Sequence, residues 1–289
     1  MKWYFWLLAL IFSAVIYKIW FAKANLRADR SISITARQLR EVSGLVTSIG
    51  NEGHIWVHND GSRSLRLFLV SADGVLKQTF KFPDVQTEDF EDIAIGRGRD
   101  GRAVVYAGDI GDNGSRRKAV RVARLYEPML GDSVGKNMVD TFFLRYPDGS
   151  RDAEAMLVDP LMNELFIISK REETPHIYKT SIEVKSMDTV EMKLVGKLKL
   201  QGAGMLKWVT AADISADGTK VLVRSYGNVY YWKRTADEPL EEMFKRSPKT
   251  LSHTSEIQGE AIGFSQDGRG FYTISEGRKP ALNYNYIRD

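Results

Sequence analysis

The feature that most constrains this chain is a hairpin motif that occurs five times. Each copy has an apolar strand, a short turn containing Gly, Asp, Asn or Pro, and a second strand rich in β-branched and aromatic residues. Such turn residues permit tight connections, and such strand residues favour extended backbone. The copies begin at Ser43, Glu91, Glu154, Ala212 and Glu260, and they end at Asp60, Asp109, Lys170, Ser225 and Glu276. The repeat therefore predicts a modular all-β fold.

The spacing of the copies predicts the four-stranded blades of a β-propeller. Successive copies begin roughly 48 to 63 residues apart, which is close to the length of one blade. Two outer strands per blade are expected at residues 65–70 and 76–82, 120–126 and 141–146, 176–181 and 192–200, and 229–233 with a weaker segment near Met243. The last copy is followed only by residues 281–287, so residues 31–35 are predicted to close the ring. We expect five blades, with six as the alternative.

Residues 3–21 are almost wholly apolar, with Ser13 and Lys18 as interruptions. A segment of this kind is either a membrane anchor or a secretory signal peptide. Its length and its terminal Trp and Tyr residues favour an anchor, whereas Ala22-Lys23-Ala24 fits a cleavage site. We therefore expect a hydrophobic N-terminal helix within residues 1–30, followed by a propeller over residues 31–289. The propeller is then expected in the cell envelope, outside the cytoplasmic membrane.

Composition excludes several classes of site. The chain contains no cysteine, so disulfides, thiolate metal sites and cysteine lipidation are excluded. The net charge of +4 comes without a stripe of Lys and Arg among aromatic residues, so a nucleic-acid partner is not expected. Gly-x-Ser-x-Gly, phosphate-loop and His-Glu-x-x-His motifs are also missing from the sequence, and hydrolase, kinase and zinc-protease readings have no motif support.

The acidic residues that open and close the copies are predicted to meet at one mouth of the channel. In a propeller blade the start of the first strand and the end of the second lie on the same face of the disc. Crowded carboxylates repel one another unless a cation or basic side chains compensate them. One solution is a hard cation such as Ca²⁺, with oxygen ligands from Glu91, Asp109, Asp112, Glu154 and Glu260. The segment 106–114, with three glycines, two aspartates and an asparagine, is typical of such a site.

The other solution is a polar plug in which Lys170, Arg171 and Arg224 pair with the acids. The same basic residues are candidates for binding a ligand at the mouth. The remaining ligand-binding candidates there are His58, Asp60 and Glu276.

Three segments carry a resemblance to known families. They are Asp89-Phe90-Glu91-Asp92-Ile93-Ala94, Asp152-Ala153-Glu154-Ala155-Met156 and Gln258-Gly259-Glu260-Ala261-Ile262. This pattern resembles the SdiA-regulated and esterase-like-phytase propellers of bacteria, and a related propeller has a loop like Gly-Asp-Ile-Gly-Asp-Asn at 108–113. The resemblance implies a divalent ion near the channel and points to Glu91, Glu154 and Glu260. Ser43 and Ala212 occupy the equivalent positions in the first and fourth copies. The implied site is therefore asymmetric and lies on the side of blades two, three and five.

Three functional hypotheses follow. The first is an envelope module that binds a divalent cation or small ligand at the mouth and has a binding or scaffolding role. The second is a metal-dependent phosphoester or lactone hydrolase, with His58 or a mouth acid as base and Lys170, Arg171 and Arg224 receiving an anion. The third is a protein-interaction platform that uses exposed loops at residues 170–175 and 235–240.

Overall fold

A computed structural model describes residues 28–135, 137–256, 258–277 and 280–288 of the chain. The predicted apolar segment at residues 3–21 lies outside the described residues. Within the described ranges, no helix has both the length and the apolar character needed to cross a bilayer.

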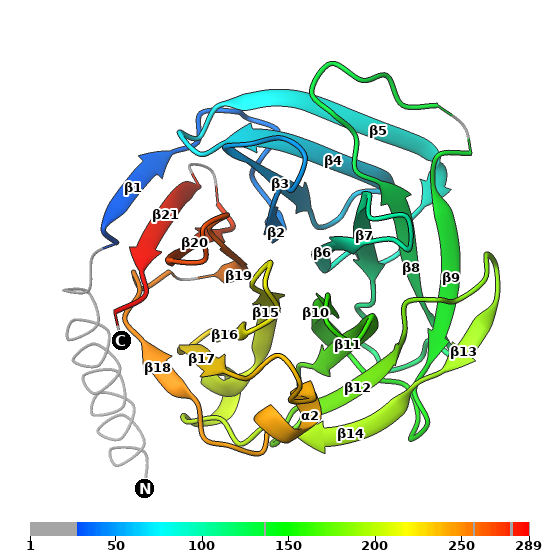
Figure 1. The fold of residues 1–289 in the computed structure, drawn as a ribbon, viewed down its shortest axis with the longest axis vertical. Helices are drawn as coiled ribbons and strands as arrows, with labels where there is room; N and C mark the ends of the chain where they lie inside the picture. Colours follow the sequence, from blue (N-terminus) through cyan, green and yellow to red (C-terminus); the bar gives the residue numbers. More distant parts are fainter. Residues whose placement is uncertain (1–27, 136, 257, 278–279, 289) are drawn as a thin grey trace, which may run out of the picture.

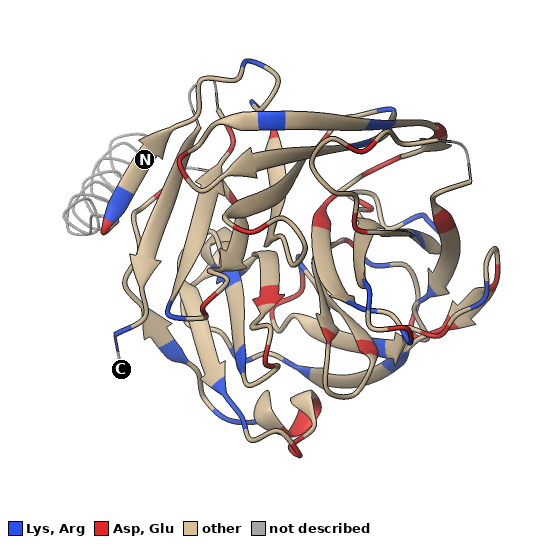
Figure 2. Cartoon of the chain, turned by 45° about the horizontal axis from the view of Figure 1, so that its top comes forward, with Lys and Arg blue, Asp and Glu red and all other residues tan. Residues whose placement is uncertain are grey.

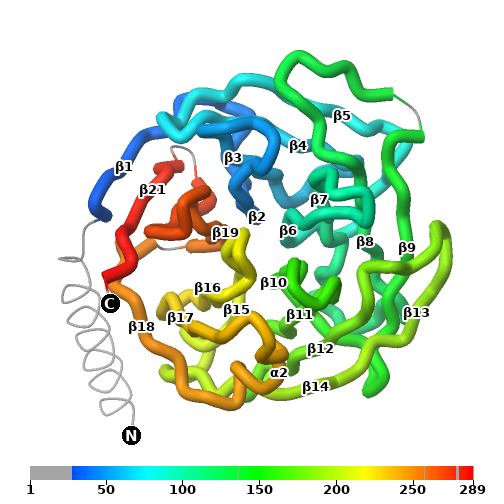
Figure 3. Tube along the Cα trace, viewed as in Figure 1, coloured from blue at the N-terminus to red at the C-terminus, as the bar shows by residue number. Residues whose placement is uncertain are grey.

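The described chain forms five antiparallel sheets arranged as blades around a central channel, as predicted (Figure 1). The innermost strands are β2 (Val42–Thr47), β6 (Asp92–Arg97), β10 (Ala153–Asp159), β15 (Val209–Ile214) and β19 (Gly259–Phe264). The second strands are β3 (His54–Asn59), β7 (Ala103–Asp109), β11 (Glu164–Ser169), β16 (Lys220–Ser225) and β20 (Gly270–Ser275). We number the blades one to five in that order, and Figure 3 shows the chain completing them in turn around the ring.

Two further strands complete each blade. The third strands are β4 (Ser64–Ser71), β8 (Val120–Tyr126), β12 (His176–Ser181), β17 (Val229–Lys233) and β21 (Ala281–Tyr286). The outer strands are β5 (Leu76–Gln86), β9 (Asp140–Arg145), β14 (Lys193–Lys197), β18 (Lys249–Leu251) and β1 (Arg30–Ser33). Strand β1 pairs with β21, so the N-terminal part of the propeller closes blade five as the sequence predicted.

Two outer segments differ from the sequence prediction. The region near Met243 is a short helix, α2 (Leu240–Met243), because Leu240 and Met243 are one helical turn apart and both bury their side chains. The fourth strand of blade four is β18 instead. The added strand β13 (Thr189–Glu191) pairs in parallel with β9 and makes blade two five-stranded.

The core is divided into five apolar clusters, one between each pair of neighbouring blades. Each cluster combines residues of adjacent first, second and third strands, so burial of apolar surface holds the blades side by side. The cluster between blades one and two contains Trp56, whose ring meets Phe80 edge to face at a centroid distance of 5.3 Å.

One buried carboxyl ties the inner strands together. Asp92 of blade two is fully buried and accepts hydrogen bonds from the backbone N–H of Met156 in blade three (2.8 Å) and of Ala212 in blade four (3.4 Å). At the equivalent register the other blades have small residues, namely Gly44, Ala155, Ala211 and Ala261.

Candidate functional site

The first strands of four blades carry a β-bulge at the mouth of the channel where the copies begin. A bulge leaves one residue out of the pairing and re-aims its side chain. The bulged residues are Ser43, Glu154, Thr210 and Glu260. In blade two Glu91 has the equivalent place directly before β6, and its N–H donates to the Gly108 carbonyl oxygen at 3.0 Å. We call these five residues the bulge ring.

The bulge ring corrects the predicted alignment of blade four. Its member is Thr210, not Ala212, because the bulge sits two residues earlier in β15 than the sequence repeat indicated. The hydroxyl of Thr210 donates to the Gly259 carbonyl of blade five at 2.8 Å, and Ser43 likewise donates to the Glu91 carbonyl of blade two at 2.8 Å. The two hydroxyl positions therefore join neighbouring blades, and the other three positions present carboxyl groups.

A second ring is formed by the residue that follows each second strand. By strand register it consists of Asp60, Ile110, Lys170, Tyr226 and Glu276. Asp60, Lys170 and Glu276 coincide with the residues predicted to end the copies, whereas Asp109 and Ser225 lie one residue before the ring positions of blades two and four. Tyr226 was therefore missed, although counting from the start of β16 in the same way as for Lys170 in blade three would have found it.

A chain of polar contacts links blades three, four and five at the mouth. The buried ammonium of Lys170 pairs with Glu154 and donates to the Tyr226 hydroxyl at 3.1 Å. That hydroxyl donates to Glu260 Oε1 at 2.8 Å. Lys170 therefore neutralises one carboxylate directly and reaches a second through a tyrosine.

Glu91 differs from the other glutamates because it is buried without compensation. It is 5% exposed, and no described residue donates a hydrogen bond to its carboxylate. A Cβ atom at Gly111 would lie 2.4 Å from Glu91 Oε1, so the glycine makes room for this carboxyl. Burial, reinforced by the charges of Glu154, Asp89 and Asp60, raises the pKa of Glu91 to about 11.

Two further mouth carboxyls share this excess of negative charge. Burial raises the pKa of Glu154 to about 8 even though Lys170 opposes the shift, and Glu154 Oε2 is buried with no hydrogen-bond partner among the described residues. Burial together with the charges of Glu260 and Asp60 raises the pKa of Glu276 to about 7. Figure 2 shows acidic segments among the strands around the channel as well as at the rim. The mouth therefore holds more carboxylates than its described basic residues neutralise.

The predicted cation ligands do not all gather at this mouth. Asp109 pairs with Arg117 (2.9 Å) and Arg121, and it accepts the backbone N–H groups of Glu88 and Asp89. Its pKa is lowered by these hydrogen bonds and charges, although burial acts against them. Asp109 is thereby held by arginines and backbone groups.

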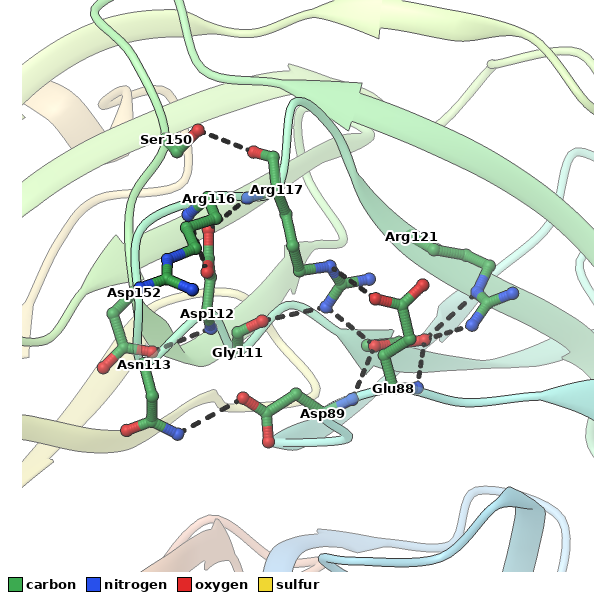
Figure 4. Close-up of polar contacts among 11 residues, drawn as sticks. Glu88, Asp89, Gly111, Asp112, Asn113, Arg116, Arg117, Arg121, Ser150 and Asp152 are labelled. Atoms are coloured by element: carbon green, nitrogen blue, oxygen red, sulfur yellow. Dashed lines mark hydrogen bonds and ion pairs between the residues drawn. The ribbon is translucent and has the colours of Figure 1, made fainter.

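Asp112 has a similar structural position in the loop after β7. It accepts the backbone N–H groups of Arg116 (2.9 Å) and Arg117 (2.7 Å), and its own N–H donates to Asp152 (Figure 4). These bonds shape the glycine-rich loop. Among the described residues, no three His, Asp or Glu side chains converge as a metal site. Of the five predicted ligands, Glu91, Glu154 and Glu260 belong to the bulge ring, where the charge of Glu154 acts on Glu91 and that of Glu260 acts on Glu154. Asp109 and Asp112 belong instead to the hydrogen-bond network around Arg116, Arg117 and Arg121.

Arg171 and Arg224, the other two basic residues predicted to bind a ligand, each form an ion pair with a carboxylate of the protein. Arg171 forms an ion pair with Asp152 and lies over the Trp208 ring, with its guanidinium carbon 4.8 Å from the ring centroid. Arg224 is 2% exposed, pairs with Glu256, and donates to the Ala261 carbonyl at 2.9 Å. Both of these cations are therefore paired with carboxylates of the protein itself.

His58 is fully buried between blades one and two and does not face the mouth. Its ring stacks on Phe90 at a centroid distance of 3.7 Å and fills the space that a Cβ at Gly44 would need. Burial lowers the pKa of His58 to about 3, which keeps the imidazole neutral. The histidine therefore acts as a packing residue in this arrangement.

Fold and site together define an all-β, five-bladed propeller with an acidic channel mouth. No family model matches the chain, and no curated protein matches it. Among solved structures, a chain of the "Crystal structure of Nidogen/Laminin Complex" is similar at 12% identity, with a TM-score of 0.46. The match covers 82% of this chain and 73% of that one.

Proposed function

We propose that this propeller is a binding module whose acidic mouth takes a positively charged ligand, either a divalent cation such as Ca²⁺ or a small organic cation. The observation that carries the proposal is the buried Glu91 carboxyl, to which no described residue donates a hydrogen bond. A buried carboxylate is costly unless it is paired, so an incoming cation gains an interaction that the protein itself does not supply.

Three glutamates provide the oxygen donors for this ligand. Glu154 Oε2 lacks a hydrogen-bond partner among the described residues. Glu260 Oε1 accepts from Tyr226, which leaves its second oxygen, and Glu91 adds its own two carboxyl oxygens. Carboxylate oxygens are the ligands that Ca²⁺ prefers. Lys170 disfavours a second positive charge beside Glu154 and Glu260 and therefore favours binding toward Glu91.

The hydrolase and platform hypotheses have less support. The hydrolase needs cations for an anionic substrate, yet Lys170, Arg171 and Arg224 each pair with a carboxylate, and His58 is buried. For the platform, no feature of the loops at 170–175 and 235–240 identifies a partner. We retain placement in the cell envelope as a proposal based on residues 3–21, and protease accessibility in intact and permeabilised cells tests it.

Glu91→Gln should abolish most of the stabilisation by the ligand while leaving the unliganded chain as stable as wild type or more stable. Glutamine keeps the shape, but its neutral amide cannot ionise to receive a cation. Thermal unfolding of the full chain is measured after chelation and then with Ca²⁺, Mg²⁺, Mn²⁺ or spermidine. A probe at 100 times its Kd adds about 2.7 kcal/mol, or about 5–10 °C in Tm for a chain of this size.

Glu191→Gln, on the exposed outer strand β13, is the matched control and should respond to the probe like wild type. The mouth assignment is wrong if Glu91→Gln and Glu191→Gln respond equally, or if no probe raises the wild-type Tm.

A further inference from the structure

The opposite end of the channel holds a second cavity that the acidic mouth does not use. Its volume is about 280 Å³, and residues of all five inner strands or the turns after them line it. The walls include Ile95 of blade two, Val158 of blade three and Phe264 of blade five. A cavity on the channel axis with walls from every blade is held rigidly, because each wall belongs to a different packed sheet.

One carboxyl group lies in this apolar wall. Asp213 lines the cavity, is 6% exposed, and accepts the backbone N–H of Phe264 at 2.7 Å. At the equivalent register the other blades have Val46, Ala94, Leu157 and Gly263. A carboxylate can accept about four hydrogen bonds, so Asp213 retains acceptor capacity toward the cavity. The polar position is therefore specific to blade four.

The other charged residue of the lining does not compensate Asp213. The guanidinium of Arg97 donates to the carbonyl of Gly101 at 2.8 Å, in the turn of its own hairpin, and no ion pair joins it to Asp213. Burial raises the pKa of Asp213 to about 7, although its hydrogen bond from Phe264 opposes the shift. A cationic group entering the cavity would favour the ionised form.

We propose that this cavity is a second binding site, for a small primary ammonium compound that carries a compact apolar body. The ammonium group meets Asp213, and the apolar body contacts Ile95, Val158 and Phe264. The size agrees with this class, since a cavity of about 150 Å³ accommodates benzene and this one leaves room for a ring with a short aminoalkyl chain. The proposal does not depend on the function proposed for the acidic mouth.

Calorimetric titration of the full chain with phenethylamine tests the proposal. The neutral 2-phenylethanol, which has nearly the same shape, should bind at least tenfold more weakly because it brings no charge to Asp213. Asp213→Asn should weaken the amine at least tenfold. Asparagine retains a carbonyl for the Phe264 N–H, so the fold is expected to survive.

Ala216→Trp is the second variant, because Ala216 is an exposed residue of the cavity rim and tryptophan there blocks entry without removing a buried group. It should also weaken the amine at least tenfold, whereas Glu191→Gln should bind like wild type. The proposal is overturned if the wild type does not bind the amine at about 10 mM, if the alcohol binds equally well, or if both cavity variants bind normally. Loss of binding in Glu91→Gln with normal binding in Asp213→Asn would assign the amine to the acidic mouth and also overturn it.

Discussion

Arg234→Met should lower the free energy of unfolding by about 3–5 kcal/mol, because it leaves a buried carboxylate without its partner. The side chains of Arg234 and Asp159 are both fully buried and form an ion pair at 2.5 Å between blades four and three. Arg234 also donates to the carbonyl oxygens of Gly218 (2.7 Å) and Glu238 (2.8 Å). Urea unfolding followed by tryptophan fluorescence measures the loss.

The matched control is Arg99→Met, in which the ion pair with Glu183 is exposed. This change should cost less than about 1 kcal/mol, since water already solvates both charges. The double variant Arg234→Met with Asp159→Leu should recover part of the lost stability, because the unpaired buried charge is then removed. A single variant Arg234→Met that unfolds like the Arg99→Met control would contradict this account of the blade contact.

Asp92→Leu should cost about 2–6 kcal/mol, since leucine cannot accept the backbone hydrogen bonds from the other blades. Two buried N–H groups, those of Met156 and Ala212, would lose their acceptor, and each unsatisfied group costs about 1–3 kcal/mol. Burial raises the pKa of Asp92 well above its usual range, which favours the neutral form of the carboxyl.

Asp92→Asn therefore serves as the matched control. Its side-chain carbonyl can accept the same backbone N–H groups in a side chain of nearly the same shape. Urea unfolding should show most of the stability retained in Asp92→Asn and lost in Asp92→Leu. Equal destabilisation of both variants would mean that the acceptor role of Asp92 is not what the fold requires.

Much of the fold was predictable because its signals are local. Turn residues and runs of β-branched residues repeat along the chain, so the hairpins, the blade number and the closing strand near residue 31 followed from the sequence. The predictions were wrong for two outer elements. The helix α2 is found where a strand was expected near Met243, and the unpredicted strand β13 is added to blade two. Those elements depend on packing against other blades, which local patterns do not encode.

The site was predicted only in part, because its details depend on register and on long-range pairing. Four of the first strands carry a bulge, and the bulge of blade four places Thr210 in the ring, two residues before the predicted Ala212. The second ring includes Tyr226, whose hydroxyl bonds to Glu260 of the next blade. The burial of His58 and the pairing of Asp109 with Arg117 and Arg121 join segments whose side-chain directions a hairpin pattern does not specify. Glu91, Glu154 and Glu260 were identified because they repeat at one strand position.

The mouth carboxyls also predict how stability depends on pH. The pKa values of Glu154 and Glu276 are raised to about 8 and about 7, above their usual value of 4.5. At a pH between the usual pKa and the raised ones, the folded chain holds protons that the unfolded chain has already released. The free energy of unfolding should therefore fall as the pH rises from about 5 to about 8. A cation stabilises the ionised carboxyls and should therefore displace these protons when it binds.

The most direct test of the acidic mouth is calorimetric titration of the full chain with Ca²⁺ and with spermidine at pH 6 and pH 8. Each titration is run in two buffers of different ionisation enthalpy, which reveals protons released on binding. We predict that at least one probe binds with proton release at pH 6 and gains about tenfold or more in affinity at pH 8, and that Glu91→Gln loses this binding. Absence of binding by both probes, or binding without proton release that Glu91→Gln leaves intact, would contradict the proposed site.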